Sequence, residues 1–280
     1  MIRTAIIAVL LLWPLQALAE IDYHLNVTLH PAEQAISSTA TIYLDETIGS
    51  LLDLEFSANC ELHSIEQAGQ SLYYSRSNEN LSIRLKNRKP VQIRYRGVFT
   101  DQPSSIPIHN EDPTYGISAS ISGRGTFLSA SAHWYPRLNR DKINYRLEVI
   151  SPPGIECVSS GKRSEHHSDD TQTVSIWKTD YPIYGLTLSA GNYMVFEDLG
   201  GSTPIYAYFY AQTTQLASTY LSEARRYLNL YEELFGPYPF HKFAIVENFF
   251  PTGYGFPSWT LLGSRVVRLP FIVKTSLGHE

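Results

Sequence analysis

The sequence predicts a mainly β protein, with an antiparallel sandwich or saddle-shaped sheet followed by a shorter segment of mixed α and β structure. The first observation is a period-two alternation of apolar and polar residues in many short segments, which is typical of half-buried strands. The second is composition, since 19 Tyr and 12 Phe among 280 residues favour strands. The third is turn chemistry, because clusters of Gly, Pro, Asn and Asp separate the segments.

Eight segments before residue 211 carry the strand pattern. In the first of them, Tyr23, Leu25 and Val27 alternate with polar neighbours. The predicted strands are 22–29, 40–44, 52–56, 81–85, 91–95, 145–150, 173–177 and 205–210. No helical stretch of convincing length interrupts them, so an antiparallel sandwich or saddle-shaped sheet is expected.

Two stretches of this region are predicted to be loops. Residues 101–116 hold three prolines among polar residues. Residues 161–171 contain Glu165-His166-His167-Ser168-Asp169-Asp170, whose side chains are of the types that bind metals. Neighbouring side chains diverge on an extended chain, so a solvated hairpin tip is favoured over a metal site.

The pattern changes after Tyr210. Apolar residues recur at spacings of three and four, which predicts a helix that starts at Thr213 or Thr214 and ends at Gly236-Pro237. The residues of this stripe are Leu216, Tyr220, Ala224, Tyr227, Tyr231 and Leu234. A short buried strand at 243–246 follows. We place the domain boundary near residue 211, between a β-rich domain at 20–210 and a second domain that begins at 211.

The chain starts with the pattern of a secretory signal peptide. A positive start, a short apolar run and Ala17-Leu18-Ala19 predict residues 1–19 as the signal, with cleavage after Ala19. The mature protein is therefore expected to be secreted or periplasmic, without a membrane partner after cleavage. The net charge is -5 and no basic stripe is present, which argues against a nucleic-acid partner. For Cys60 and Cys157, a disulfide and two buried thiols both remain open.

The last 45 residues carry a family resemblance. F-G-P-Y-P-F at 235–240 precedes F-A-I-V-E-N-F-F at 243–250 and P-T-G-Y-G-F-P-S at 251–258, and the chain closes with S-L-G-H-E at 276–280. This order resembles the approach to the active site in the aminopeptidase N-like zinc metallopeptidases, the gluzincins. The resemblance implies that 20–210 is the N-terminal β domain of that family. It also implies that 211–280 is the incomplete start of a thermolysin-like catalytic domain.

The resemblance implies a zinc site that this chain supplies only in part. The family motif is H-E-x-x-H on a helix, where two His bind zinc and the Glu acts as general base. His279 matches the first His and Glu280 matches the base. The second His and a third ligand are not in the sequence, and a catalytic zinc needs three protein ligands. We therefore expect a truncated chain that is inactive alone, with a complementing C-terminal fragment as a possible partner.

The resemblance also implies a substrate-binding strand. Family aminopeptidases carry G-x-M-E-N on an edge strand, whose backbone pairs with the peptide or protein substrate while its Glu holds the free amine. The matching residues here are Gly253, Tyr254, Gly255 and Phe256, and Gly255 stands in the place of that Glu. A standard aminopeptidase is therefore not expected, and internal cleavage, another specificity and loss of activity all remain open. A plain glycine turn in which Tyr254 packs fits the same residues.

Two further expectations follow from the sequence. One alternative function is a secreted, non-catalytic β-sandwich module that binds peptide or glycan. The segment after the helix is also expected to lack packing partners and to expose an apolar patch. The residues of that patch are Leu261, Leu262, Val266, Val267, Leu269, Phe271 and Ile272.

Overall fold

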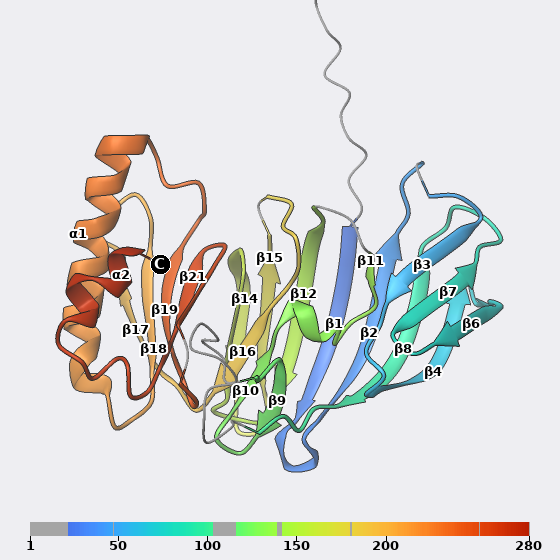
Figure 1. The fold of residues 1–280 in the computed structure, drawn as a ribbon, viewed down its shortest axis with the longest axis horizontal. Coiled ribbons are helices and arrows are strands. Elements are labelled where there is room, and N and C mark those ends of the chain that lie inside the picture. The colour runs from blue at the N-terminus through green and yellow to red at the C-terminus, as the bar shows by residue number, and fades with distance from the viewer. Residues whose placement is uncertain are drawn as a thin grey trace, which may run out of the picture.

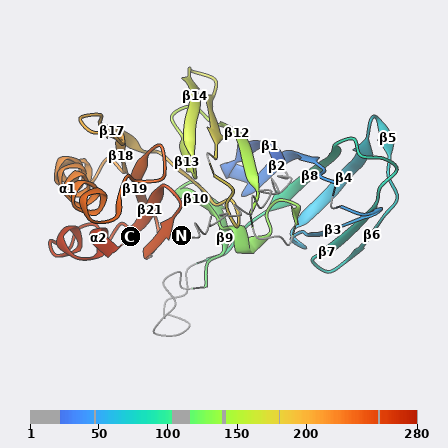
Figure 2. The ribbon, with the colours of Figure 1, turned by 90° about the horizontal axis from the view of Figure 1, so that it is seen from above.

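The computed structural model describes residues 22–46, 48–102, 116–138, 142–179, 181–251 and 253–279. The expected signal peptide, most of the 101–116 loop and Glu280 lie outside these residues. The chain is mainly β, as the alternation predicts, and its sheets follow one another along an elongated molecule (Figure 1). Seen from above, helices α1 (Ala217–Phe235) and α2 (Ser276–His279) lie at one end, and strands β5 (Gln70–Ser71) and β6 (Tyr74–Ser77) lie at the other (Figure 2).

The largest sheet has eight strands in the order β14-β15-β12-β1-β2-β8-β4-β5. β1 and β12 pair in parallel, and the other pairs are antiparallel. Tyr23, Leu25 and Val27 are buried, which confirms the alternation read from the sequence. The strands are β1 Asp22–His30, β2 Ala35–Tyr43, β4 Cys60–Gln67, β5 Gln70–Ser71, β8 Val91–Val98, β12 Asn144–Ser151, β14 Lys162–Ser168 and β15 Thr173–Lys178.

Two four-stranded sheets pack on this large sheet and share its hydrophobic core. One has the order β13-β16-β10-β9 and the other β11-β3-β7-β6. Short 3-10 helices, η1 Pro31–Glu33 and η2 Ala130–Ala132, lie in the connections. The strands are β3 Leu51–Glu55, β6 Tyr74–Ser77, β7 Asn80–Arg84, β9 Ala119–Ser122, β10 Gly125–Leu128, β11 Arg137–Leu138, β13 Glu156–Ser159 and β16 Leu188–Gly191.

The prediction of a loop at 161–171 is wrong for most of these residues. Residues Lys162–Ser168 form β14, which pairs with β15 at the edge of the large sheet. Nearly all its residues are exposed on both faces, so the strand has no apolar alternation for the sequence to show. Only the tip around Asp169 and Thr171 is a turn, held by the Asp169 carboxylate.

The fourth sheet has the order β17-β18-β19-β21-β20. β18, β19 and β21 are parallel to one another, whereas β17 and β20 are antiparallel to their neighbours at the two edges. β17 and β18 precede residue 211, so this sheet begins before the boundary expected there. The strands are β17 Met194–Asp198, β18 Ile205–Phe209, β19 Phe243–Asn248, β20 Gly253–Phe256 and β21 Trp259–Gly263.

Helix α1, Ala217–Phe235, follows η3, Thr214–Leu216, and agrees with the predicted helix. It covers the outer face of the fourth sheet (Figure 1). Phe243 and Ile245 of β19 face the core under α1, whereas Ala244 and Val246 belong to the core of the first three sheets, which we call the N-terminal sheets. β19 is therefore buried on both faces. Within the described residues, no helix combines the length and apolar character that crossing a bilayer requires.

The prediction of an exposed apolar patch after the helix is largely wrong. Leu261, Leu262, Val267 and Ile272 are buried, and only Leu269 and Phe271 are exposed. The packing surface comes from α1 and the fourth sheet, which local sequence patterns do not reveal. Val267 and Ile272 join the core under α1 together with Leu277. Leu277 lies in the last short helix, α2 Ser276–His279, which follows η4 Ile272–Lys274.

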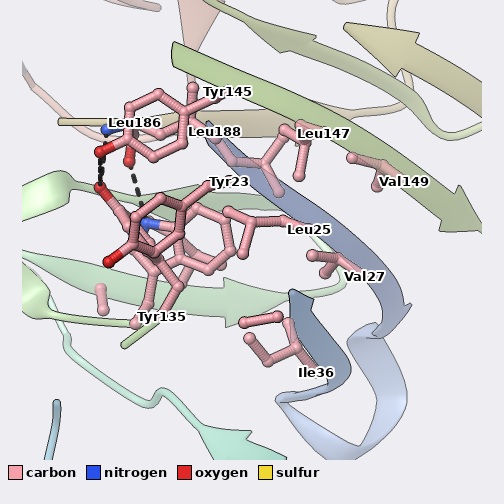
Figure 3. Close-up of a cluster of buried hydrophobic side chains, with 14 of the residues drawn as sticks. Tyr23, Leu25, Val27, Ile36, Tyr135, Tyr145, Leu147, Val149, Leu186 and Leu188 are labelled. Atoms are coloured by element: carbon pink, nitrogen blue, oxygen red, sulfur yellow. Dashed lines mark hydrogen bonds between the residues drawn. The ribbon is translucent and has the colours of Figure 1, made fainter. Parts of the chain in front are cut away.

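Buried tyrosines contribute hydrogen bonds and ring contacts to the core of the N-terminal sheets (Figure 3). The Tyr135 hydroxyl accepts a hydrogen bond from the Leu186 amide at 3.0 Å and bonds the Tyr145 hydroxyl at 3.1 Å. Tyr23 packs against both rings, and its hydroxyl accepts from the Leu138 amide at 3.0 Å. Burial raises the pKa of Tyr135, so it stays a neutral hydroxyl.

Replacing Tyr135 by Phe is expected to destabilise the chain by about 2 kcal/mol, because the buried Leu186 amide loses its acceptor. Urea unfolding measures the change in free energy. Tyr73→Phe is the control, since that side chain is 73% exposed, and it is expected to change nothing. Equal stability of the two variants would contradict the role given to Tyr135.

Candidate functional site

β20 is the outermost strand of the fourth sheet and pairs with β21. A two-residue turn at Pro257-Ser258 joins them, with Phe256 opposite Trp259. A two-residue hairpin closes on a hydrogen-bonded pair, and hydrogen-bonded pairs alternate along an antiparallel ladder. The backbone N–H and C=O groups of Gly253 and Gly255 are therefore directed to the open edge. At Gly253 and Gly255, β20 thus presents backbone groups at a sheet edge, an arrangement that is suited to pairing with an added strand.

The side chains of β20 fasten it to the rest of the protein. Tyr254 stacks on Phe127 of β10 with the ring centroids 6.4 Å apart. Phe256 stacks on Trp259 at 4.4 Å. The Thr260 hydroxyl donates to the Tyr254 carbonyl at 3.0 Å. Side chains thus anchor the strand while two glycines at the open edge leave close access to its backbone. The residues read as a possible glycine turn form a strand.

No carboxylate of the 253–256 segment faces this edge, because the segment carries none. The nearest acidic residue along the chain, Glu247, is buried and serves the fold. Its carboxylate accepts from the Tyr210 amide at 2.9 Å and from the Thr213 hydroxyl. Glu247 therefore holds the connection that leads into α1.

His279 ends α2 and is exposed. It borders a cavity of about 690 Å³ between α1 and α2, lined mostly by aromatic and apolar side chains that include Tyr231, Phe235 and Leu277. The Tyr231 hydroxyl donates to the Gly278 carbonyl at 2.5 Å, which holds α2 on α1. A Cβ at Gly278 would lie 2.6 Å from the Tyr227 ring, so this close approach requires glycine.

The described residues do not by themselves make a zinc site. Among them, no three His, Cys, Asp or Glu side chains are grouped so that they can hold a metal ion. His279 brings one imidazole, whereas a catalytic zinc takes three protein ligands. In the 161–171 segment, His166 lies 3.0 Å from the Glu156 carboxylate and His167 lies 3.1 Å from Asp169. The two imidazoles thus have separate partners.

The two cysteines are free thiols, and both are buried. Burial raises the pKa of Cys60 and of Cys157 to about 12. Thiols of that pKa are inert as nucleophiles near neutral pH. The sequence left open a disulfide or two buried thiols, and the structure has two buried thiols.

The structure brings together only part of the sequence-based site. Gly253, Tyr254, Gly255 and Phe256 lie on one strand, and α2 with His279 packs on α1 and η4. Glu280 lies outside the described residues. Sequence reasoning missed Phe127, whose strand is fully buried and has no alternation. It also missed Ser258, although Pro257-Ser258 between two apolar runs is a turn signal.

No family model matches the chain, and no curated protein matches it in sequence. Solved structures with the same fold do match. An M1 zinc metallopeptidase from Deinococcus radiodurans, a glutamate-to-alanine mutant bound to the substrate Tyr-Ser-Ala, has a TM-score of 0.70 at 14% identity, over 93% of this chain and 64% of that one. A second structure of an M1 zinc metallopeptidase from Deinococcus radiodurans has a TM-score of 0.68 at 16% identity, over 92% and 63%.

A two-domain M1 zinc metallopeptidase mutant bound to L-arginine gives a TM-score of 0.70 at 15% identity, over 93% of this chain and 64% of that one. The chain thus has the fold of the corresponding part of these proteins. It spans somewhat less than two thirds of their length.

Proposed function

We propose that this chain forms the N-terminal part of a zinc metallopeptidase of the M1 type, and that β20 is its substrate-binding strand. The observation that carries the proposal is the match of 93% of this chain to structures of that type. The open edge of β20 supports it, because that edge suits backbone pairing with an extended peptide.

The proposed substrates are peptides or proteins bound as an added strand. Gly253 and Gly255 direct backbone donors and acceptors to the edge, so binding draws on main-chain hydrogen bonds rather than on side-chain recognition. Gly255 carries no carboxylate to pair with a free amine. We therefore propose that peptides with a free and with a blocked N-terminus bind alike, which departs from a standard aminopeptidase.

The proposed metal is zinc, with His279 as one ligand and Glu280 as the general base. The remaining ligands have to come from a C-terminal segment, in the same polypeptide or in a complementing chain. Alone, the 280-residue chain is proposed to hold no catalytic zinc and to be inactive. Sequencing the coding DNA past the codon for Glu280 tests whether the reading frame continues into the second His of the motif.

The proposed location is outside the cytoplasm, after cleavage behind Ala19. This rests on the pattern of residues 1–19. The competing function is a secreted peptide- or glycan-binding module without catalysis. The open β20 edge suits such a module equally well, so zinc content of the complete protein separates the two.

Replacing Gly255 by Pro is expected to weaken peptide binding about tenfold, because proline removes a backbone donor from the open edge. The probes are Tyr-Ser-Ala and its N-acetylated form, titrated by NMR against the chain. Both are expected to lose affinity equally.

Gly255→Ala is the matched control, since it keeps the N–H group and is expected to bind as the parent does. Unchanged binding in Gly255→Pro would remove β20 from the proposal. A strong preference for the free N-terminus in the parent chain would contradict the role given to Gly255.

A further inference from the structure

Lys242 is a buried lysine directly before β19, with 3% of its surface exposed. Its ammonium group donates to the Ser258 hydroxyl at 2.9 Å and to the Ser258 carbonyl at 3.2 Å. It also lies 5.2 Å from the centre of the Trp177 ring, a cation–π distance. Burying an ammonium group costs free energy unless it is well hydrogen-bonded. Because both of these hydrogen bonds from Lys242 go to Ser258, they stabilise one conformation of that residue.

Ser258 needs such stabilisation, because its backbone is in the left-handed region with φ of 76°. A proline followed by a residue of positive φ is the pattern of a type II turn, which favours Gly or Asn at the second position. Two-residue hairpins also prefer the mirror-image turns, whose twist matches that of the strands. The turn between β20 and β21 is therefore unfavourable in both respects.

The turn is also fixed to the N-terminal sheets. The Ser258 hydroxyl accepts from the Gly161 amide at 3.0 Å, and the Trp259 indole donates to the Ser160 hydroxyl at 3.2 Å. Within the fourth sheet, the Ser258 carbonyl accepts a second bond besides that from Lys242, from the Ala244 amide of β19 at 3.1 Å. Lys242, Ser258 and Gly161 thus form one polar cluster, which we call the turn lock. It joins the start of β19, the β20–β21 turn and the connection between β13 and β14.

We propose that Lys242 is a positioning residue that holds β20 in place for peptide binding through the turn lock. Among the described residues, β20 has a strand neighbour on one side only, so its direction depends on the turn and on the two aromatic contacts of Tyr254 and Phe256. The lock fixes the turn at one end of the strand. This inference rests on the proposed function for its consequence in peptide binding, but its structural part does not.

The test compares Lys242→Met with Lys89→Met, which makes the same change at an exposed position. Amide hydrogen exchange is measured by NMR across the whole chain. In Lys242→Met, exchange in β20 and β21 is expected to rise at least about tenfold, because bonds to a charged donor are lost. Exchange in β1 and β12 is expected to stay unchanged. Affinity for N-acetylated Tyr-Ser-Ala is expected to fall in the same variant.

A rescue variant separates positioning from a general loss of stability. Lys242→Met combined with Ser258→Gly is expected to recover part of the β20 protection, since glycine adopts a positive φ without strain, although the bond from the Gly161 amide to the Ser258 hydroxyl is lost. Equal exchange increases in all sheets, or unchanged β20 exchange, would overturn the proposal. If β20 exchange rises and is rescued while neither the parent chain nor any variant binds the peptide, the lock stands and the proposed function fails.

Discussion

Replacing Gly161 by Ala is expected to destabilise the chain by about 3 kcal/mol or more. Gly161 has φ of 88°, a conformation that side-chain-bearing residues rarely adopt. A Cβ on this backbone would lie 2.1 Å from the Lys178 carbonyl oxygen and 2.6 Å from its carbon. Since these are backbone atoms of β15, no side-chain rotation relieves the overlap. The movement that relieves it also disturbs the bond from Gly161 to Ser258.

Urea unfolding of Gly161→Ala and Gly69→Ala measures this effect. Gly69 also has a positive φ, of 75°, but a Cβ there meets no atom within 4 Å. The control variant therefore carries only the conformational cost, about 1 kcal/mol. Equal losses of unfolding free energy in the two variants would contradict this prediction. They would show that small movements relieve the overlap with Lys178 and that the turn lock tolerates them.

In a polypeptide that joins this chain to a C-terminal segment with the other ligands, His279→Ala is expected to remove zinc and peptidase activity. Loss of a partner that only orients a ligand already lowers zinc affinity about 10- to 100-fold, so loss of a ligand is expected to exceed that. Zinc content by mass spectrometry and hydrolysis of Tyr-Ser-Ala are the measurements. Both readouts are expected to fall together.

His63→Ala is the matched control, because His63 is exposed on β4 in the N-terminal sheet. It is expected to retain zinc and activity in full. A His279→Ala protein that still holds one zinc per chain would remove His279 from the metal site. A parent protein that holds no zinc would favour the binding-module alternative.

Sequence periodicity predicted the elements whose two sides face different surroundings. β1 alternates because one face packs in the core and the other is less buried, and α1 has its apolar stripe because only one side meets the fourth sheet. Gly236 and Pro237 predicted the end of α1, and the helix does end at Gly236. The elements that were missed lack this contrast. β10 is buried on both faces, and β14 is exposed on both.

The candidate site divides in the same way. Residues 253–256 were found from their resemblance to a family motif, which also implied an edge strand, but the sequence did not reveal that this strand pairs with β21. The sequence did not reveal the turn lock either, because Lys242 and Gly161 are 81 positions apart and share Ser258 as a partner only once the chain has folded.

The sequence by itself determined the β-rich class, the long helix and the segment that resembles a peptidase substrate strand. These depend on local patterns, in which each residue's neighbours in the chain decide its conformation. Only the tertiary structure decided that β17 and β18 join the fourth sheet, that Leu261 and Leu262 are buried, and which backbone groups of β20, those of Gly253 and Gly255, face its open edge. The physical reason is that burial and strand pairing are set by contacts between distant segments, which the order of residues along the chain does not display.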